Sequence, residues 1–312
     1  MHVLFDHDGG IDDLISLAML LAMEHVDLRG VVVTPADSYL RPALSATQKI
    51  LRRFGRTDIP VAAGTLRGAN PFPRAWRAQP YAVDALPILN EPSTPLVAPV
   101  AAPGHLFLAE KLAAAADPVT VLITGPATNL AAAFALDPTL PAKVREVVWM
   151  GGALHVEGNV HDYEHDGSAE WNAYWDPDAT QALLASGAPI TLFPLDVTNH
   201  VPVTMAWLER LARQRAHSLS DFAGQCWAMT VGAIPAYAYI YHMWDTLATG
   251  YLGAPDLVSV RPVQCQVDTA PPSAGRIRPV ESGGAPLRAA VDVDVPRFLD
   301  YVLDLLRRDI DP

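Results

Sequence analysis

Short apolar runs alternate with longer, largely apolar segments along much of the chain. The short runs have strand length and lie at residues 3–5, 28–33, 59–62, 119–123, 146–150 and 190–193. The longer segments have helical length and cover residues 14–23, 42–54 and 105–116, with a further one after residue 129. Strands that alternate with helices predict a mostly parallel sheet joined by right-handed crossovers. The expected fold class is therefore α/β, with a central sheet flanked by helices.

The C-terminal part has a different pattern. Residues 203–251 are expected to be helical, residues 256–293 to form short strands and turns, and residues 295–308 to form a final helix. Residues 65–103 make a long Pro-rich connection, which is typical of a functional loop or lid. Neither a repeat nor a linker marks a boundary, so we predict one Rossmann-like domain over residues 1–312 with a helical C-terminal part.

Composition argues against several classes of protein. The chain has 312 residues, of which 50% are apolar, so a large core is available. A formal net charge of −12 argues against nucleic acid or an anionic membrane surface as a partner. Two cysteines, Cys226 and Cys265, make neither a disulfide framework nor a zinc site. Neither a signal peptide nor an apolar run of the ~18 residues that a membrane helix needs is visible, so a cytoplasmic protein is expected.

The chemistry is expected to centre on the beginning of the chain. Four carboxylates fall within eight residues, between an apolar strand and an apolar helix: Asp6, Asp8, Asp12 and Asp13. Capping of the helix explains one or two of them. It does not explain the others, because clustered carboxylates resist ionisation without a positive charge among them, and the first Lys or Arg is Arg29. A cation bound by oxygens, Ca²⁺ or Mg²⁺, is therefore the favoured interpretation.

Further polar residues follow other predicted strands. Asp37 comes after the second strand, residues 124–129 follow the fourth, and residues 150–152 follow the fifth. The carboxyl ends of parallel strands meet at one edge of a sheet, so these segments are expected to converge with the aspartates. Each of them alone is also typical of an ordinary turn or cap.

Two later segments mix polar and aromatic residues. Glu170 and Asn172 stand two apart between tryptophans, so in an extended segment they point to the same side. This pattern fits a hydrogen-bonded loop edge or the recognition of a polyhydroxylated ligand. Trp244 and Asp245 stand at a predicted helix start, where Asp245 alone is typical of a cap and Trp244 alone of a core.

Together these residues resemble the calcium-dependent inosine-uridine-preferring nucleoside hydrolases over nearly the whole chain. The matching motifs are Asp6-His-Asp-Gly-Gly-Ile-Asp-Asp13, Thr124-Gly-Pro-Ala-Thr-Asn129, Met150-Gly-Gly152, Gly158-Asn159, Glu170-x-Asn172 and Trp244-Asp245. The Asp-His-Asp-Gly opening, Asn70-Pro-Phe-Pro-x-x-Trp76-Arg77 and Glu170-Trp-Asn-x-Tyr-Trp-Asp-Pro177 are similar to the purine-specific branch. The resemblance implies the nucleoside hydrolase fold and hydrolysis of the N-glycosidic bond of purine ribonucleosides to ribose and free base.

The resemblance also implies a calcium site. Ca²⁺ is expected on Asp8, Asp13, Asp245 and the carbonyl of Thr124, with Asp6 as a further ligand or as a support of the others. Such an ion holds the attacking water and the ribose 2′- and 3′-hydroxyls, lowers the pKa of the water and fixes its line of attack. Asp8 is expected to take the proton as general base.

Four residues are expected from the resemblance to hold the ribose. Asp12 is expected to bind the 2′-hydroxyl, Asn172 the 3′-hydroxyl, and Asn159 and Glu170 the 5′-hydroxyl. Such polar anchors imply specificity for ribose, because a missing hydroxyl leaves buried groups unpaired.

The leaving base is expected, again from the resemblance, between two tryptophans, Trp76 and Trp244. Stacking raises the proton affinity of the base, so that solvent can protonate it, and Asp37 matches an acid that lines the base pocket. Two positions depart from the family. Trp244 replaces a His suited to general acid work, with His242 two residues earlier, and Gly10 stands where purine-specific relatives carry Asn. Broad base specificity is therefore an alternative.

Two other functions compete with this one. Residues 5–9 also resemble the opening motif of haloacid-dehalogenase phosphatases, but the Thr or Val expected after Gly9 and a convincing late Gly-Asp-x-x-x-Asp are missing. The second is a catalytically weak nucleoside-binding or scaffold protein, which Gly10 favours and Asp8 argues against. The resemblance also implies a homodimer or homotetramer, with residues 203–251 as a candidate interface.

Overall fold

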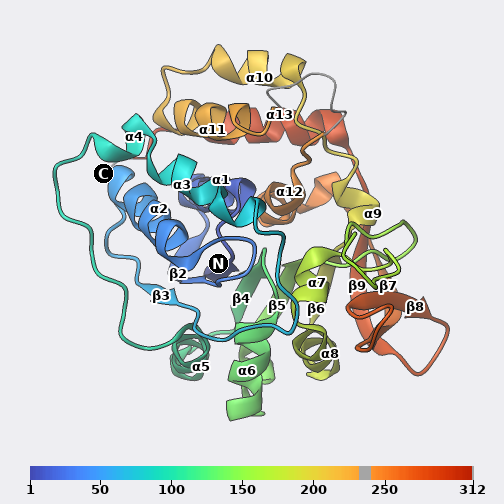
Figure 1. The fold of residues 1–312 in the computed structure, drawn as a ribbon. Helices are drawn as coiled ribbons and strands as arrows, with labels where there is room; N and C mark the ends of the chain where they lie inside the picture. The colour runs from blue at the N-terminus through green and yellow to red at the C-terminus, as the bar shows by residue number, and fades with distance from the viewer. Residues whose placement is uncertain (232–239, 311–312) are drawn as a thin grey trace.

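The sheet is the centre of the molecule. The structure is a computed structural model that describes residues 1–231 and 240–310, and within them nine strands form one sheet in the order β3-β2-β1-β4-β5-β6-β9-β7-β8 (Figure 1). The strands are β1 His2–His7, β2 Asp27–Val33, β3 Val61–Ala63, β4 Val119–Ile123, β5 Val144–Met150, β6 Ile190–Phe193, β7 Val258–Asp268, β8 Arg276–Val280 and β9 Ala285–Val293. The pairs from β3 to β9 are parallel, and β7 runs antiparallel to β8 and β9. The predicted α/β class with a mostly parallel sheet is confirmed.

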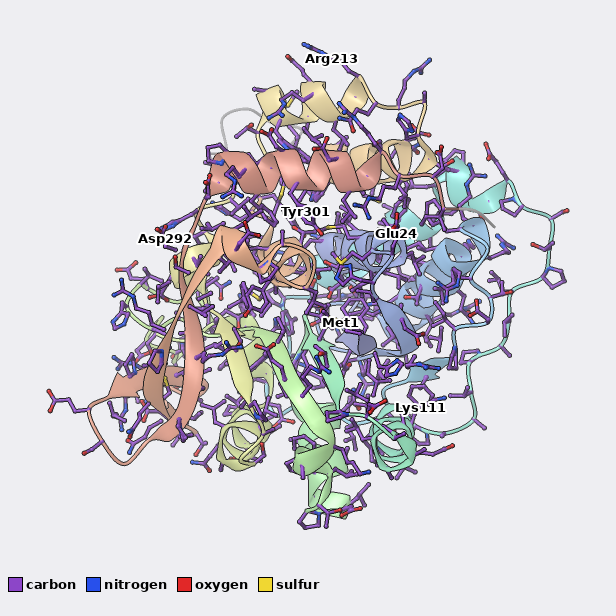
Figure 2. All side chains as sticks on the ribbon, turned by 180° about the vertical axis from the view of Figure 1, so that it is seen from behind. Met1, Glu24, Lys111, Arg213, Asp292 and Tyr301 are labelled. Carbon is purple, nitrogen blue, oxygen red and sulfur yellow. The ribbon has the colours of Figure 1, made fainter. Side chains whose placement is uncertain are left out.

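Helices cover both faces of the sheet (Figure 1). One layer holds α1 Ile11–Ala22, α2 Leu40–Arg53, α11 Ser218–Ala228, α12 Trp244–Tyr251 and α13 Val295–Leu306, and the other holds α5 Gly104–Ala114, α6 Thr128–Leu136 and α8 Pro177–Ala185. Side chains alternate along a strand, so Val3 and Phe5 of β1 pack in the first core and Leu4 packs in the second. In Figure 2, Tyr301 of α13 and Lys111 of α5 lie on opposite sides of the sheet.

Shorter helices lie in the connections. They are Trp76–Ala78 (η1), Gln79–Asp84 (α3), Pro87–Asn90 (α4), Leu140–Lys143 (η2), Trp171–Trp175 (α7), Leu195–Thr198 (α9), Met205–Ala212 (α10) and Pro255–Leu257 (η3). Residues 65–103, which were predicted to be a long Pro-rich connection, contain η1, α3 and α4. None of the helices in the described ranges is long and apolar enough to cross a membrane.

The C-terminal part agrees with its pattern only in outline. The helical prediction over 203–251 is confirmed for α10, α11 and α12, while residues 232–239 lie outside the described residues. The prediction of short strands over 256–293 is wrong in length, because β7 has 11 residues and β9 has 9. β9 pairs with β6, and β7 pairs with both β9 and β8, so these three strands extend the central sheet.

The strand order determines where loops can converge. From β1 the chain passes through α1 to β2 and β3 on one side, and then returns through α5 to β4 on the other side of β1. The connections that follow β1 and β4 therefore diverge at a topological switch point, where open α/β sheets bind ligands. The predicted aspartate loop and the segment that begins at Thr124 both start at this point.

Candidate active site

A cavity of about 170 Å³ opens at the carboxyl ends of β1, β4 and β5 and is called the inner cavity below. It brings together the predicted site residues Asp8, Asp12, Asp13, Asp37, Trp76, Thr124, Asn159, Glu170, Asn172, Trp244 and Asp245. Of the predicted set, only Asp6 is absent from its lining. Sequence reasoning did not select five further lining residues as site residues: Phe72, Gln79, Met150, Trp171 and Tyr241.

The aspartate loop is fixed by one hydrogen bond of its own and by hydrogen bonds from two other segments. Asp13 accepts the backbone N–H of Gly10 at 2.7 Å and also accepts the hydroxyl of Thr124. Asp8 accepts the backbone N–H of Asp37 at 3.0 Å. Asp13 therefore closes the first turn of α1, as the capping interpretation expects. Capping accounts for one oxygen of Asp13 and leaves the neighbouring buried carboxylates unexplained.

The buried carboxylates of the inner cavity repel one another, and no positively charged residue that the structure describes lies among them to offset the repulsion. Oxygens of Asp12, Asp13 and Asp245 lie within 4.8 Å of one another, and all three residues are buried. Burial raises the pKa of Asp8, Asp13 and Asp245 well above its usual range, and neighbouring carboxylates raise it further. No Lys or Arg lines the inner cavity in the described part of the chain. An all-oxygen set of buried carboxylates fits a hard divalent cation such as Ca²⁺.

Asp6 lies behind the cavity wall at the end of β1. It accepts hydrogen bonds from the hydroxyl of Thr34 at 2.8 Å and from the amide of Asn129 at 3.2 Å. Burial raises its pKa to about 7, and the two hydrogen bonds oppose the rise. Asp6 thus joins the ends of β1, β2 and α6, which fits a supporting role better than direct contact with a ligand.

Glu170 itself has an extended backbone, but Asn172 lies in the helix α7, so the prediction of one extended segment that holds both residues is wrong. Glu170 is the N-cap of α7 and accepts the backbone N–H groups of Asn172 at 2.9 Å, Ala173 at 3.4 Å and Gly152 at 2.9 Å. Burial raises the pKa of Glu170 to about 7 against these three bonds. The carboxylate therefore already has its polar partners within the protein.

Two asparagines complete this side of the inner cavity. Asn172, on α7, donates its side-chain amide to the carbonyl of Thr124 at 3.0 Å and to that of Met150 at 3.2 Å. Asn159 accepts the backbone N–H of Trp171 at 3.1 Å through its side-chain oxygen. Asn172 thereby joins the ends of β4 and β5, and Asn159 positions the start of α7.

Aromatic rings form the mouth of the inner cavity. Trp76 and Trp244 are both partly exposed there, and the other tryptophans are buried. Trp76 packs edge-on against Trp171 with ring centroids 5.5 Å apart, while Trp244 lies 4.8 Å from Tyr241. The indole N–H of Trp244 donates to Asn199 at 2.9 Å, which holds that ring in place. A flat apolar group has stacking surfaces at this mouth, above a floor of carboxylates.

A comparison with models of protein families identifies the family of the chain. The family model described as "Inosine-uridine preferring nucleoside hydrolase" matches residues 3–300 of the chain. The chain belongs to this family. The crystal structure of an inosine-uridine preferring nucleoside hydrolase from Bacillus anthracis is 43% identical and covers 98% of this chain and 99% of its own, with a TM-score of 0.93.

The names of other relatives indicate different preferred bases. The pyrimidine-specific ribonucleoside hydrolase RihA of Shewanella baltica is 32% identical over 263 residues, which is 81% of this chain and 74% of the relative. A purine-preferring ribonucleoside hydrolase from Gardnerella vaginalis has a TM-score of 0.79 over 98% of both chains, but at 24% identity it supports the fold alone. Membership of the nucleoside hydrolase family therefore leaves the base open.

Gly10, one of the two departures from the family motifs, has a steric setting that the sequence could not show. A Cβ atom at Gly10 would lie 2.9 Å from a carboxylate oxygen of Asp37 and 3.0 Å from one of Asp13. Loss of solvation raises the pKa of Asp37 to about 7, Asp12 adds to the rise, and Arg77 opposes it. Any larger residue at position 10 must displace the Asp37 carboxylate.

The other departure is Trp244, which stands where the family carries a His, and His242 lies two residues earlier. His242 is absent from the lining of the inner cavity, and its ring lies 5.5 Å from that of Trp244. Burial lowers the pKa of its imidazole. These contacts fit a structural role next to Trp244 better than direct proton donation.

Proposed function

We propose that the protein is a calcium-dependent purine nucleosidase. It hydrolyses the N-glycosidic bond of purine ribonucleosides to ribose and free base. The observation that carries this proposal is one cavity with two parts: a floor of buried carboxylates and a mouth of partly exposed tryptophans. Membership of the nucleoside hydrolase family supplies the reaction class.

Asp8 is the general base of the proposed reaction. The backbone N–H of Asp37 donates to one of its carboxylate oxygens and fixes it, and Asp8 lines the inner cavity in which the attacking water lies. Asp8 takes a proton from the attacking water, whose oxygen bonds to C1′ of the ribose. The electron pair of the broken C–N bond leaves with the base, which gains a proton from solvent.

Asp8, Asp13, Asp245 and the carbonyl of Thr124 would hold Ca²⁺. The ion supplies positive charge among the carboxylates and lowers the pKa of the attacking water. Asp12 lies beside this set, with both its oxygens held by hydrogen bonds, and orients the ribose 2′-hydroxyl. Asn172, whose amide contacts the carbonyl of Thr124, orients the 3′-hydroxyl, and Asn159 and Glu170 hold the 5′-hydroxyl.

Purine preference rests on Trp76 and Trp244. A purine offers two fused rings to stack between them, and stacking contributes on the order of 1 kcal/mol per ring pair beyond area burial. Broad specificity is the second candidate. The names of the Bacillus anthracis and Shewanella baltica relatives favour it, since they include uridine and the pyrimidines.

Steady-state release of ribose from inosine, guanosine, adenosine, cytidine and uridine tests both candidates. The assay is run with calcium, with a chelator and with Asp8→Ala. We expect fast purine and slow pyrimidine turnover, and a loss of at least about 100-fold in kcat for the variant. Equal rates on pyrimidines would favour broad specificity. Ribose binding without turnover of any nucleoside would favour the nucleoside-binding protein.

A further inference from the structure

A second cavity, of about 430 Å³, adjoins the inner cavity and is called the outer cavity. Phe72, Trp76, Asn159 and Trp171 line both cavities, so one wall separates them. The rest of the outer cavity is lined by Pro71, Pro73, His161 and Asp162. A group that extends past these shared residues from the inner cavity therefore enters a second space, bounded by the rings of Phe72, Trp76 and Trp171.

Asn159 stands in the shared wall in a fixed position. Its backbone N–H donates to the carbonyl of Ala169 at 3.0 Å, and its side-chain oxygen accepts from Trp171. Gly158 before it allows this close approach, because a Cβ there would lie 2.0 Å from the Ala169 carbonyl oxygen. The side-chain Nδ2 of Asn159 makes no hydrogen bond within the described residues. It is a fixed donor between the two cavities, on the side where the 5′ end of the ribose is placed.

Glu170 does not depend on the 5′-hydroxyl of the substrate for its hydrogen bonds. Its carboxylate already accepts three backbone N–H groups, so removal of a substrate 5′-hydroxyl leaves it with partners. Sites reject a substrate without a hydroxyl when the loss leaves buried groups unpaired. This penalty is small at Glu170, so at the 5′ end it falls on the Nδ2 of Asn159, which is only half-buried and therefore accessible to water.

The lining of the outer cavity selects an uncharged, apolar group. Phe72 and Trp171 have ring centroids 5.3 Å apart, and two prolines extend the apolar surface. The carboxylate of Asp162, which accepts the hydroxyl of Tyr174 at 3.2 Å, faces an anion unfavourably. Neither Lys nor Arg lines this cavity among the described residues, so the imidazole of His161 is the one group of the lining that could pair with a phosphate. Thioether sulfur makes favourable contacts with aromatic rings at about 5 Å.

We propose that the outer cavity is a subsite for an apolar 5′-substituent, so that the protein hydrolyses 5′-deoxy-5′-alkylthio nucleosides as well as ordinary ribonucleosides. The inference rests on the proposed nucleoside hydrolysis and extends its substrate class. The chemical step is unchanged: water adds to C1′, the C–N bond breaks, and the products are a 5-deoxy-5-alkylthio-ribose and the free base. The thioether lies in the outer cavity and takes no part in bond changes.

The test compares kcat/KM for inosine, 5′-deoxy-5′-methylthioinosine, its butylthio homologue and inosine 5′-phosphate. We expect both thioethers within about tenfold of inosine, and the phosphate at least about 100-fold lower. His161 lines the outer cavity but not the inner one, so His161→Trp adds bulk to the outer cavity alone. It is expected to lower kcat/KM for the butylthio substrate at least about tenfold and to leave inosine unchanged. The matched control is His155→Trp, at an exposed position that lines neither cavity.

The outcomes separate the subsite from the reaction. Turnover of inosine together with thioethers at least about 100-fold poorer would overturn the subsite and leave the hydrolase intact. An equal loss on inosine and on the butylthio substrate in His161→Trp would also overturn it. Turnover of the phosphate at the rate of inosine would contradict the selection of an uncharged group. Absence of turnover of inosine itself would instead refute the proposed function.

Discussion

Asp12 is held at both of its carboxylate oxygens by residues from the C-terminal part of the chain. Tyr241 donates its buried hydroxyl to one oxygen at 2.5 Å, and the backbone N–H of Asp245 donates to the other at 3.2 Å. Burial and the nearby Asp12 carboxylate raise the pKa of Tyr241 well above its usual range, so this hydroxyl stays a donor. The orientation of Asp12 toward a ribose 2′-hydroxyl therefore depends on Tyr241.

Tyr241→Phe is expected to impair ribonucleosides selectively. A hydrogen bond to a charged group contributes about 1.5–3 kcal/mol, so kcat/KM for inosine should fall about 10- to 100-fold. For 2′-deoxyinosine, which lacks the hydroxyl that Asp12 orients, we expect a change of less than about threefold. Tyr163→Phe, at a side chain that is 88% exposed, is the matched control. Equal losses on both substrates would show that Tyr241 supports the fold alone.

The predictability of single residues depends on how local their signal is. Asp8, Asp12 and Asp13 could be selected because their clustering is visible within one loop of the sequence. Tyr241 could not, because its partner lies 229 positions away and a lone tyrosine in an apolar segment is typical of a core. Trp171 stood inside a recognised motif, between Glu170 and Asn172, and only the packing of Trp76 against it indicates that it lines the cavity.

At the scale of elements, the five-residue helix α7 is the part of the site that sequence patterns misjudged. A segment of alternating aromatic and polar residues has strand character, and a single helical turn is too short to display helical periodicity. Its helical state comes from its N-cap, since Glu170 accepts the N–H groups of Asn172 and Ala173. The cap also turns Glu170 into a buried acid.

Glu170→Gln is expected to change how stability depends on pH. Burial raises the pKa of Glu170 from 4.5 to about 7, so the folded state holds this proton more tightly than the unfolded state. The protonated Glu170 contributes on the order of 3 kcal/mol to stability. This contribution is complete below pH 4.5 and is lost as the pH rises to 7. The free energy of unfolding, measured with urea in the presence of a chelator, should therefore decrease less between pH 5 and pH 8 for the variant than for the wild type.

Glu157→Gln provides the control for that experiment. Glu157 is exposed on the preceding loop, so its replacement should leave the pH dependence of the wild type unchanged. An identical decrease in the free energy of unfolding for Glu170→Gln and the wild type would contradict the buried, proton-holding state of Glu170.

For the whole molecule, the class of fold followed from the alternation of strands and helices, and the place of the site followed from strand ends that share one edge. The antiparallel addition of β7 and β8 did not follow, because these strands are mostly half-buried or exposed and mix polar with apolar residues. The expected homodimer or homotetramer stays a prediction, as does the interface over 203–251.

Calcium is expected to stabilise the whole fold. An ion that binds only the folded state at 100 times its Kd adds about 2.7 kcal/mol to the free energy of unfolding. Calcium added to chelated protein should therefore raise Tm, and Asp13→Asn should abolish most of the rise. Magnesium should act more weakly, because it prefers a smaller octahedral site with several waters. A Tm that does not change when calcium is added would argue against the ion site.

The distribution of the tryptophans has a spectroscopic consequence. Of the seven indoles, only Trp76 and Trp244 are partly exposed, and both stand at the mouth of the inner cavity. A neutral quencher in solution therefore reaches mainly these two rings, and a base that stacks between them shields both. The intrinsic emission of the protein thus serves as an optical reporter of occupancy, without any label and without turnover of the ligand.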